Sequence, residues 1–184
     1  MLRGAPPEVN DASCIPARLT CVHQTEELRY LILAAQREGN RALTAALQPY
    51  GLTTAQAEAI DVLRKADRPL AVKEVGERLI REHGSPSRLM RTLSDKGFVE
   101  PLPTRDDARL TLLRLTARGR AAARRMTRVK RQIDEAIAPI LEQHDVEAAC
   151  ELLRSLTRDL PAGRALARRI ADEESMRQHG HGGS

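Results

Sequence analysis

Aromatic residues are nearly absent from this chain of 184 residues. They make up 2% of it, there is no tryptophan, and the three rings belong to Tyr30, Tyr50 and Phe98. The hydrophobic core must therefore be aliphatic, which suits packed helices. Proteins that bind single-stranded nucleic acid stack bases on aromatic rings, so this class of partner is disfavoured. No apolar run approaches the roughly 20 residues of a membrane span, and no secretion signal is visible, so we expect a cytoplasmic protein.

Cysteine and histidine are few and scattered. Cys14, Cys21 and Cys150 have no paired spacing, which predicts free thiols. None of the five histidines stands at a metal-ligand spacing from another ligand residue. We therefore expect no cofactor, no metal ion and no enzymatic activity.

The sequence has an excess of positive charge, and this excess is concentrated in one segment. The net charge of the whole chain is +5, and residues 78–120 alone hold ten Lys or Arg against five Asp or Glu. This excess favours a polyanionic partner. The alternative interpretation is an arginine-rich surface that only contacts solvent.

The stretch 85–97 has the pattern of a short helix. Ser85 is a good N-cap, and Pro86 suits the first helical position, where a missing N–H costs nothing. Leucine and methionine then recur at helical spacing, with arginines on the opposite face. Gly97 ends the helix, since glycine adopts the left-handed conformation most easily.

A hairpin is predicted to follow this helix. Two strands are expected at 98–102 and 110–115, joined by a polar tip at 104–109. Pro101 and Pro103 restrict the first strand to the edge of a sheet. A basic helix followed by a basic-tipped hairpin is typical of a winged helix, whose helix fits the DNA major groove.

These motifs resemble the MarR family of bacterial transcription regulators over about residues 51–121. Ala108 differs from many members, which have a second basic residue there. The matching segments are Gly51-Leu52-Thr53-Thr54-Ala55-Gln56, Gly97-Phe98-Val99, Asp107-Ala108-Arg109 and Leu115-Thr116-Ala117-Arg118-Gly119.

The resemblance implies a mainly α fold, with a winged helix-turn-helix domain and a small β-hairpin wing between N- and C-terminal dimerisation helices. The expected parts are a flexible or extended arm at 1–18, a dimerisation helix at 19–50, the DNA-binding domain at 51–120, C-terminal dimerisation helices at 121–176 and a disordered tail at 177–184.

The residue pattern predicts the individual helices. The first, from about Leu19 to Gln48, has a weak point at Gly39-Asn40. Thr53 and Gln56 form a capping-box pattern that opens a second helix. A third helix is expected to begin at Leu70, with Val72, Val75, Leu79 and Ile80 facing inward. A longer helix is expected from Thr116, and Pro139 should kink or end it. Two more helices are expected, one with its N-cap at Asp145 and one over residues 162–176.

Eight residues of the helix and the wing are expected to contact DNA: Ser85, Ser87, Arg88, Arg91, Thr92, Arg105, Asp107 and Arg109. The arginines of the helix would read bases in the major groove, and the hydroxyl groups would donate to phosphates or bases. The resemblance implies that Arg109 enters the minor groove and that Asp107 orients it. Two alternatives are ordinary surface arginines at 88 and 91, and a metal site at Asp106-Asp107.

The resemblance further implies a homodimeric regulator, and we expect a repressor that binds a pseudo-palindromic duplex. A small-molecule effector between the dimerisation helices and the wing domain would release the DNA. The alternatives are a winged-helix protein-interaction module and a non-specific chromosome-binding protein. Peroxide sensing by a first-helix cysteine, as in some relatives, is disfavoured because the sensing position falls near Arg29 and not at Cys21.

Overall fold

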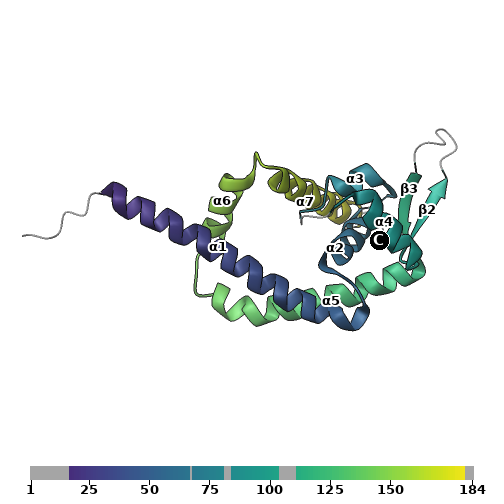
Figure 1. Ribbon diagram of the computed structural model, residues 1–184, viewed down its shortest axis with the longest axis horizontal. Helices are drawn as coiled ribbons and strands as arrows, with labels where there is room; N and C mark the ends of the chain where they lie inside the picture. Colours follow the sequence, from purple (N-terminus) through teal and green to yellow (C-terminus); the bar gives the residue numbers. More distant parts are fainter. Residues whose placement is uncertain (1–16, 67, 81–83, 104–110, 181–184) are drawn as a thin grey trace, which may run out of the picture. The chain divides into compact units, whose positions relative to one another are not determined.

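The computed structural model describes residues 17–66, 68–80, 84–103 and 111–180 (Figure 1). The described chain is mainly helical with one small antiparallel sheet, as predicted. It divides into two compact units, Met1–Ala42 and Leu43–Ser184. No helix in the described part is both long enough and apolar enough to cross a membrane. The elements are α1 (Ala17–Leu47), the 3-10 helix η1 (Gln48–Tyr50), α2 (Thr54–Lys65), β1 (Leu70–Ala71), α3 (Val72–Gly76), α4 (Pro86–Asp95), β2 (Val99–Pro103), β3 (Thr111–Leu115), α5 (Ala117–Leu141), α6 (Val146–Thr157) and α7 (Pro161–Gly180).

The first helix, α1, continues through Gly39 and Asn40, so the weak point in the sequence does not interrupt it. Its large apolar side chains remain accessible: Leu31 is 59% exposed and Ile32 is 40% exposed. The predicted helix is therefore present, and its apolar stripe is exposed.

The core of the second unit is aliphatic and lies around α2. The N-terminus of α2 is held by the predicted capping box, in which the N–H groups of Gln56 and Thr53 each donate to the other residue's side chain at 3.2 Å. Ile60 and Ala59 of this helix are completely buried. The largest fully buried side chains of the core are Leu47, Ile60, Leu70, Leu93, Val62, Val75 and Val99.

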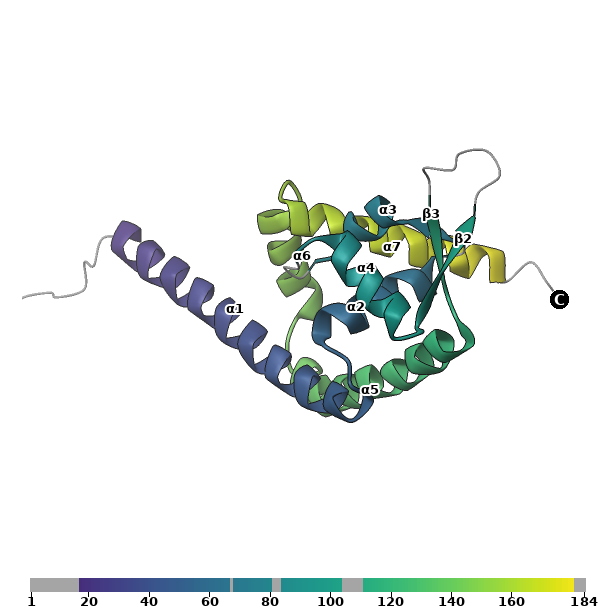
Figure 2. The ribbon, with the colours of Figure 1, turned by 45° about the vertical axis from the view of Figure 1, so that its right-hand side comes forward.

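The sheet has the strand order β1-β3-β2, and both pairs are antiparallel. Strand β2 is therefore an edge strand, as its two prolines predict. Figure 2 shows β2 and β3 as a long hairpin beside α4. The register places Val99 opposite Leu115 and Pro103 opposite Thr111.

The predicted helix from Leu70 is wrong at both ends. Leu70 and Ala71 form β1 and pair with Leu113 and Leu112, because a strand partner is available there that the sequence pattern does not reveal. Helix α3 starts only at Val72, where the Ala71 N–H donates to the Glu74 carboxylate at 2.8 Å. It ends at Gly76, and Ile80, expected to face inward, is 37% exposed.

The three C-terminal helices follow the predicted breaks with two differences. Helix α5 includes Pro139 and ends at Leu141, so the proline stands in its last turn. Asp145 caps α6 by accepting the Ala148 N–H at 3.0 Å, as predicted. Helix α7 begins at Pro161 and extends to Gly180, four residues past the predicted end of the helical segment.

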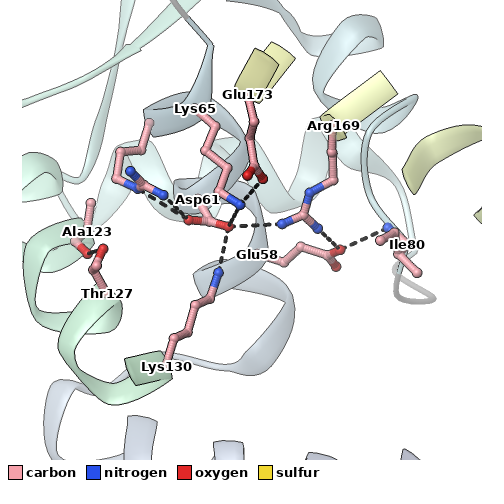
Figure 3. Close-up of polar contacts among 10 residues, drawn as sticks. Glu58, Asp61, Lys65, Ile80, Ala123, Thr127, Lys130, Arg169 and Glu173 are labelled. Carbon is pink, nitrogen blue, oxygen red and sulfur yellow. Dashed lines mark hydrogen bonds and ion pairs between the residues drawn. The ribbon is translucent and has the colours of Figure 1, made fainter. Parts of the chain in front are cut away.

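A cluster of ion pairs joins α2 to α5 and α7 (Figure 3). Asp61 of α2, whose side chain is 4% exposed, contacts Lys130 of α5 at 2.6 Å and Arg169 of α7 at 2.9 Å. Arg169 also contacts Glu58 at 3.0 Å. Further pairs in or beside the cluster are Asp61–Arg64, Asp61–Lys65, Lys65–Glu173 and Arg78–Asp172.

The charge balance of this cluster is visible in the pKa of Asp61. Burial of the carboxyl group raises its pKa, but the positive charges of Lys130, Lys65 and Arg64 outweigh burial and lower the pKa to about 2. The carboxylate is therefore ionised in the folded protein at neutral pH. It connects the winged-helix core to α7 and to the middle of α5.

Gly119 allows α5 to start directly against the backbone of Phe98, the residue before β2. A Cβ atom at this position would lie 2.0 Å from the carbonyl oxygen of Phe98, a backbone atom that also accepts the Thr116 N–H. We expect Gly119→Ala to lower the free energy of unfolding by about 1–3 kcal/mol, the usual cost of overpacking. Urea unfolding of the wild type and the variant measures this change in the free energy of unfolding.

The matched control is Gly39→Ala, the same substitution in a helix where nothing lies within 4 Å of the new Cβ. There alanine is expected to stabilise the helix by about 0.5–1 kcal/mol. A neutral result for Gly119→Ala would contradict the close approach of α5 to Phe98.

Candidate nucleic-acid interface

Helix α4 begins as the sequence predicts. Ser85 is the N-cap residue in extended conformation, Pro86 occupies the first turn, and the Leu89 N–H donates to the Ser85 carbonyl at 3.1 Å. The Ser85 side chain makes no capping hydrogen bond. Its hydroxyl group is exposed at the start of the helix.

Helix α4 has one buried face and one exposed face. Met90 and Leu93 are 3% and 0% exposed and anchor the helix in the core. Ser87, Arg88 and Arg91 are exposed. Because Arg88 and Arg91 are three residues apart, they are neighbours on the helix surface.

Thr92 differs from the other predicted contact residues. It is half-buried, and its hydroxyl group donates to the Arg88 carbonyl oxygen at 3.0 Å. The hydroxyl proton is thus used within the helix. Thr92 retains only its acceptor capacity for a ligand.

The guanidinium groups of Arg88 and Arg91 have no ion-pair partner among the residues that the structure describes. By contrast, Arg114 on β3 contacts Glu100 across the hairpin at 2.6 Å. All the donors of Arg88 and Arg91 are therefore available to a carboxylate, phosphate or base edge.

The C-terminal end of α4 is fixed to the core. Gly97 has a φ of 71° and closes the helix, with the Phe98 N–H donating to the Leu93 carbonyl at 2.9 Å. Lys96 donates to the carbonyl oxygen of Gly51 at 3.0 Å and to the Gln56 side chain at 3.2 Å. These contacts hold α4 rigidly, so its exposed arginines have a defined position relative to the hairpin.

The hairpin tip lies outside the described residues. Arg105, Asp107 and Arg109 belong to this segment, so their predicted role and the predicted contact between Asp107 and Arg109 remain predictions. The structure does describe both strands up to Pro103 and from Thr111. No group of three His, Cys, Asp or Glu residues that could hold a metal ion occurs within the described ranges.

Two features of this region were not predicted from the sequence. Lys96 is used to attach α4 to α2, although its charge alone suggested a surface residue. Asp61 lies in a run of five consecutive buried residues, 59–63. A charged residue among buried apolar neighbours requires partners, and this was the available signal for the cluster with Arg169.

Comparison with known proteins supports this geometry. A family of winged helix DNA-binding domains matches residues 52–119. No curated protein matches the chain.

Solved structures cover most of the chain. The reduced form of MarR from E. coli is 26% identical, with a TM-score of 0.58, and the match covers 71% of this chain and 96% of that protein. A MarR mutant from E. coli complexed with operator DNA is 24% identical, with a TM-score of 0.57, covering 75% and 96%. The S. aureus MepR–DNA complex is 21% identical, with a TM-score of 0.59, covering 72% and 95%.

Proposed function

Because this chain belongs to the MarR family of winged helix-turn-helix transcription regulators, we propose that it is a homodimeric repressor of a pseudo-palindromic duplex operator. The observation that carries the proposal is the exposed face of α4. It presents Arg88 and Arg91 beside a hairpin, and neither arginine has an acidic partner in the described part of the chain. The two structural neighbours with DNA support the proposal by their shared fold.

Exposed apolar side chains support a dimer. Helix α6 has no buried residue, and its Leu152, Leu153 and Leu156 are 41–52% exposed. Leu31 of α1 is 59% exposed. Exposed leucines of this kind are typical of a surface that another chain covers. We assign α1 and α6 to the contact between two copies.

An open surface pocket supports control by a small effector. It has a volume of about 840 Å³ and lies between the end of α3 and the start of α7. Leu79, Ile80, Pro161 and Ala165 give it apolar walls, and Glu77 and Arg168 add charges of opposite sign. Because α3 packs against α4, the proposed recognition helix, a ligand bound here would shift α4 relative to the C-terminal helices. We propose that this shift changes the half-site spacing and releases the DNA.

The test is a salt titration of binding to two duplexes, one a palindrome selected from protected genomic sites and one a scrambled duplex of equal length. We expect two chains per palindrome, with half-sites about 10 base pairs apart. If about six phosphates are contacted per dimer, log K should fall with log salt at a slope of about −5.

Three outcomes would contradict the proposal. A slope near zero would mean that the arginines contact only solvent. Equal affinity for both duplexes would instead indicate non-specific chromosome binding, and weak binding to both would favour a protein-interaction module.

A further inference from the structure

Helix α5 carries a concentration of positive charge that the proposed operator site does not use. From residue 117 to residue 133 there is no Asp or Glu, and the first acid is Asp134. The same segment contains seven cationic residues: Arg118, Arg120, Arg124, Arg125, Arg128, Lys130 and Arg131.

Three of these cations contact a buried carboxylate or an aromatic ring of the fold. Lys130 contacts the buried carboxylate of Asp61 at 2.6 Å. The guanidinium group of Arg118 lies 4.7 Å from the centre of the Phe98 ring, and that of Arg125 lies 5.8 Å from the centre of the Tyr50 ring. These residues therefore contribute to the structure of the domain itself.

The other four form one exposed line along α5, which we name the α5 arginine stripe: Arg120, Arg124, Arg128 and Arg131. Their spacing of four, four and three residues places them on one face of the helix. The opposite face is buried and contains Ala123, Met126 and Val129. At 1.5 Å per residue the stripe extends over about 16 Å.

The stripe is poorly neutralised. Arg120 gives one N–H to the Leu115 carbonyl at 2.7 Å, and Arg131 contacts Glu135 at 3.3 Å in an exposed pair. No acid within the described ranges pairs with Arg124 or Arg128. In the cluster around Asp61, by contrast, cations from three helices share buried carboxylates.

The close spacing of arginines in the stripe lowers the stability of α5. Like charges four residues apart on a helix repel each other, as Arg120, Arg124 and Arg128 do. A bound polyanion relieves the repulsion along the whole line. Arginine is also the cation whose planar group best matches phosphate oxygens in a bidentate contact.

We propose that the α5 arginine stripe is a second DNA contact, which binds the phosphate backbone of duplex DNA separately from the recognition helix. Duplex DNA fits better than a single strand, because the chain has only three aromatic rings for base stacking. The contact requires no operator sequence, since phosphates carry no sequence information. It therefore goes beyond the proposed operator binding.

The test compares the full-length protein with Arg124→Gln/Arg128→Gln in binding to a scrambled duplex at several salt concentrations. Glutamine keeps the helix propensity of arginine, so α5 should remain folded. If each of the four arginines that a dimer loses contacts one phosphate, the slope of log K against log salt should become shallower by about 4. The control is Arg164→Gln/Arg177→Gln, which removes the same charge from exposed positions of α7, and its slope should equal that of the wild type.

Sequence preference separates this inference from the proposed function. The ratio of affinities for a selected palindrome and the scrambled duplex should be unchanged in Arg124→Gln/Arg128→Gln and lost in Arg88→Gln/Arg91→Gln. An unchanged salt slope in the α5 variant overturns the inference and leaves operator binding intact.

Two other results would also overturn it. Polyglutamate that competes as well as a duplex of equal charge would identify an acidic protein as the partner. Loss of the dimer in sedimentation of the α5 variant would assign the stripe to a contact between copies of this chain.

Discussion

Asp61→Ala is expected to lower the free energy of unfolding by about 3–5 kcal/mol, the usual result of removing one partner from a buried ion pair. The carboxylate is 4% exposed and contacts Lys130 and Arg169 at 2.6 Å and 2.9 Å. Its removal leaves these cations without their shared acid and breaks the ion pairs that connect α2 to α5 and α7. Urea unfolding at neutral pH measures the loss.

Asp134→Ala is the matched control for this prediction. Asp134 is an exposed acid of α5, and surface substitutions of this kind usually change stability by less than about 0.5 kcal/mol. If both variants lower the free energy of unfolding by equally small amounts, the cluster around Asp61 does not hold α7 on the winged-helix core.

The same cluster gives stability a defined dependence on pH. The pKa of Asp61 is lowered from 3.8 to about 2 in the folded protein, so the unfolded chain binds its proton more readily. The stabilisation by ionised Asp61 is therefore fully present above pH 3.8 and is lost as the pH falls through about 2. It amounts to about 2 kcal/mol. In Asp61→Asn this part of the loss of stability at low pH should be absent. If the free energy of unfolding of the variant depends on pH as that of the wild type does, Asp61 is not the group responsible.

Arg88→Ala/Arg91→Ala is expected to remove most of the sequence preference in DNA binding. Each bidentate contact to a base contributes about 1–3 kcal/mol of discrimination, so the double variant should lose roughly 30-fold to 10⁴-fold in preference at each half-site of the palindrome. Both side chains are exposed on α4, while Met90 and Leu93 of the same helix keep it in the core. The fold should therefore be unaffected.

The measurement compares the palindrome with duplexes in which one base pair of each half-site is exchanged. The variant should bind all of them similarly, whereas the wild type should discriminate. Arg164→Ala/Arg177→Ala serves as a control, because it removes two exposed arginines from α7 and should preserve the preference. A loss of affinity that is equal on every duplex would show instead that Arg88 and Arg91 contact phosphates.

Much of the winged helix is predictable from local pattern. The capping box at Thr53, the start of α4 at Pro86 and its end at Gly97 all follow from residues that act within a few positions of themselves. The edge position of β2 follows from Pro101 and Pro103, which lack the N–H that a central strand needs. The same local signals support the resemblance to the MarR family. The DNA contacts of Arg105, Asp107 and Arg109 remain predictions that rest on this resemblance.

The sequence by itself therefore determined most of the helices, the capping box at Thr53 and the exposed face that presents Arg88 and Arg91, because these depend on spacing and on backbone chemistry within one element. Only the tertiary structure decided that Leu70 and Ala71 pair with β3, since a strand of two residues exists only by its partner. It also decided which cations are neutralised. Lys130 and Arg169 meet Asp61 from 69 and 108 residues away, whereas the structure shows no acid paired with Arg124 or Arg128 in its described part. Charge pairing between distant segments depends on where the helices pack, and no local pattern in the sequence encodes it.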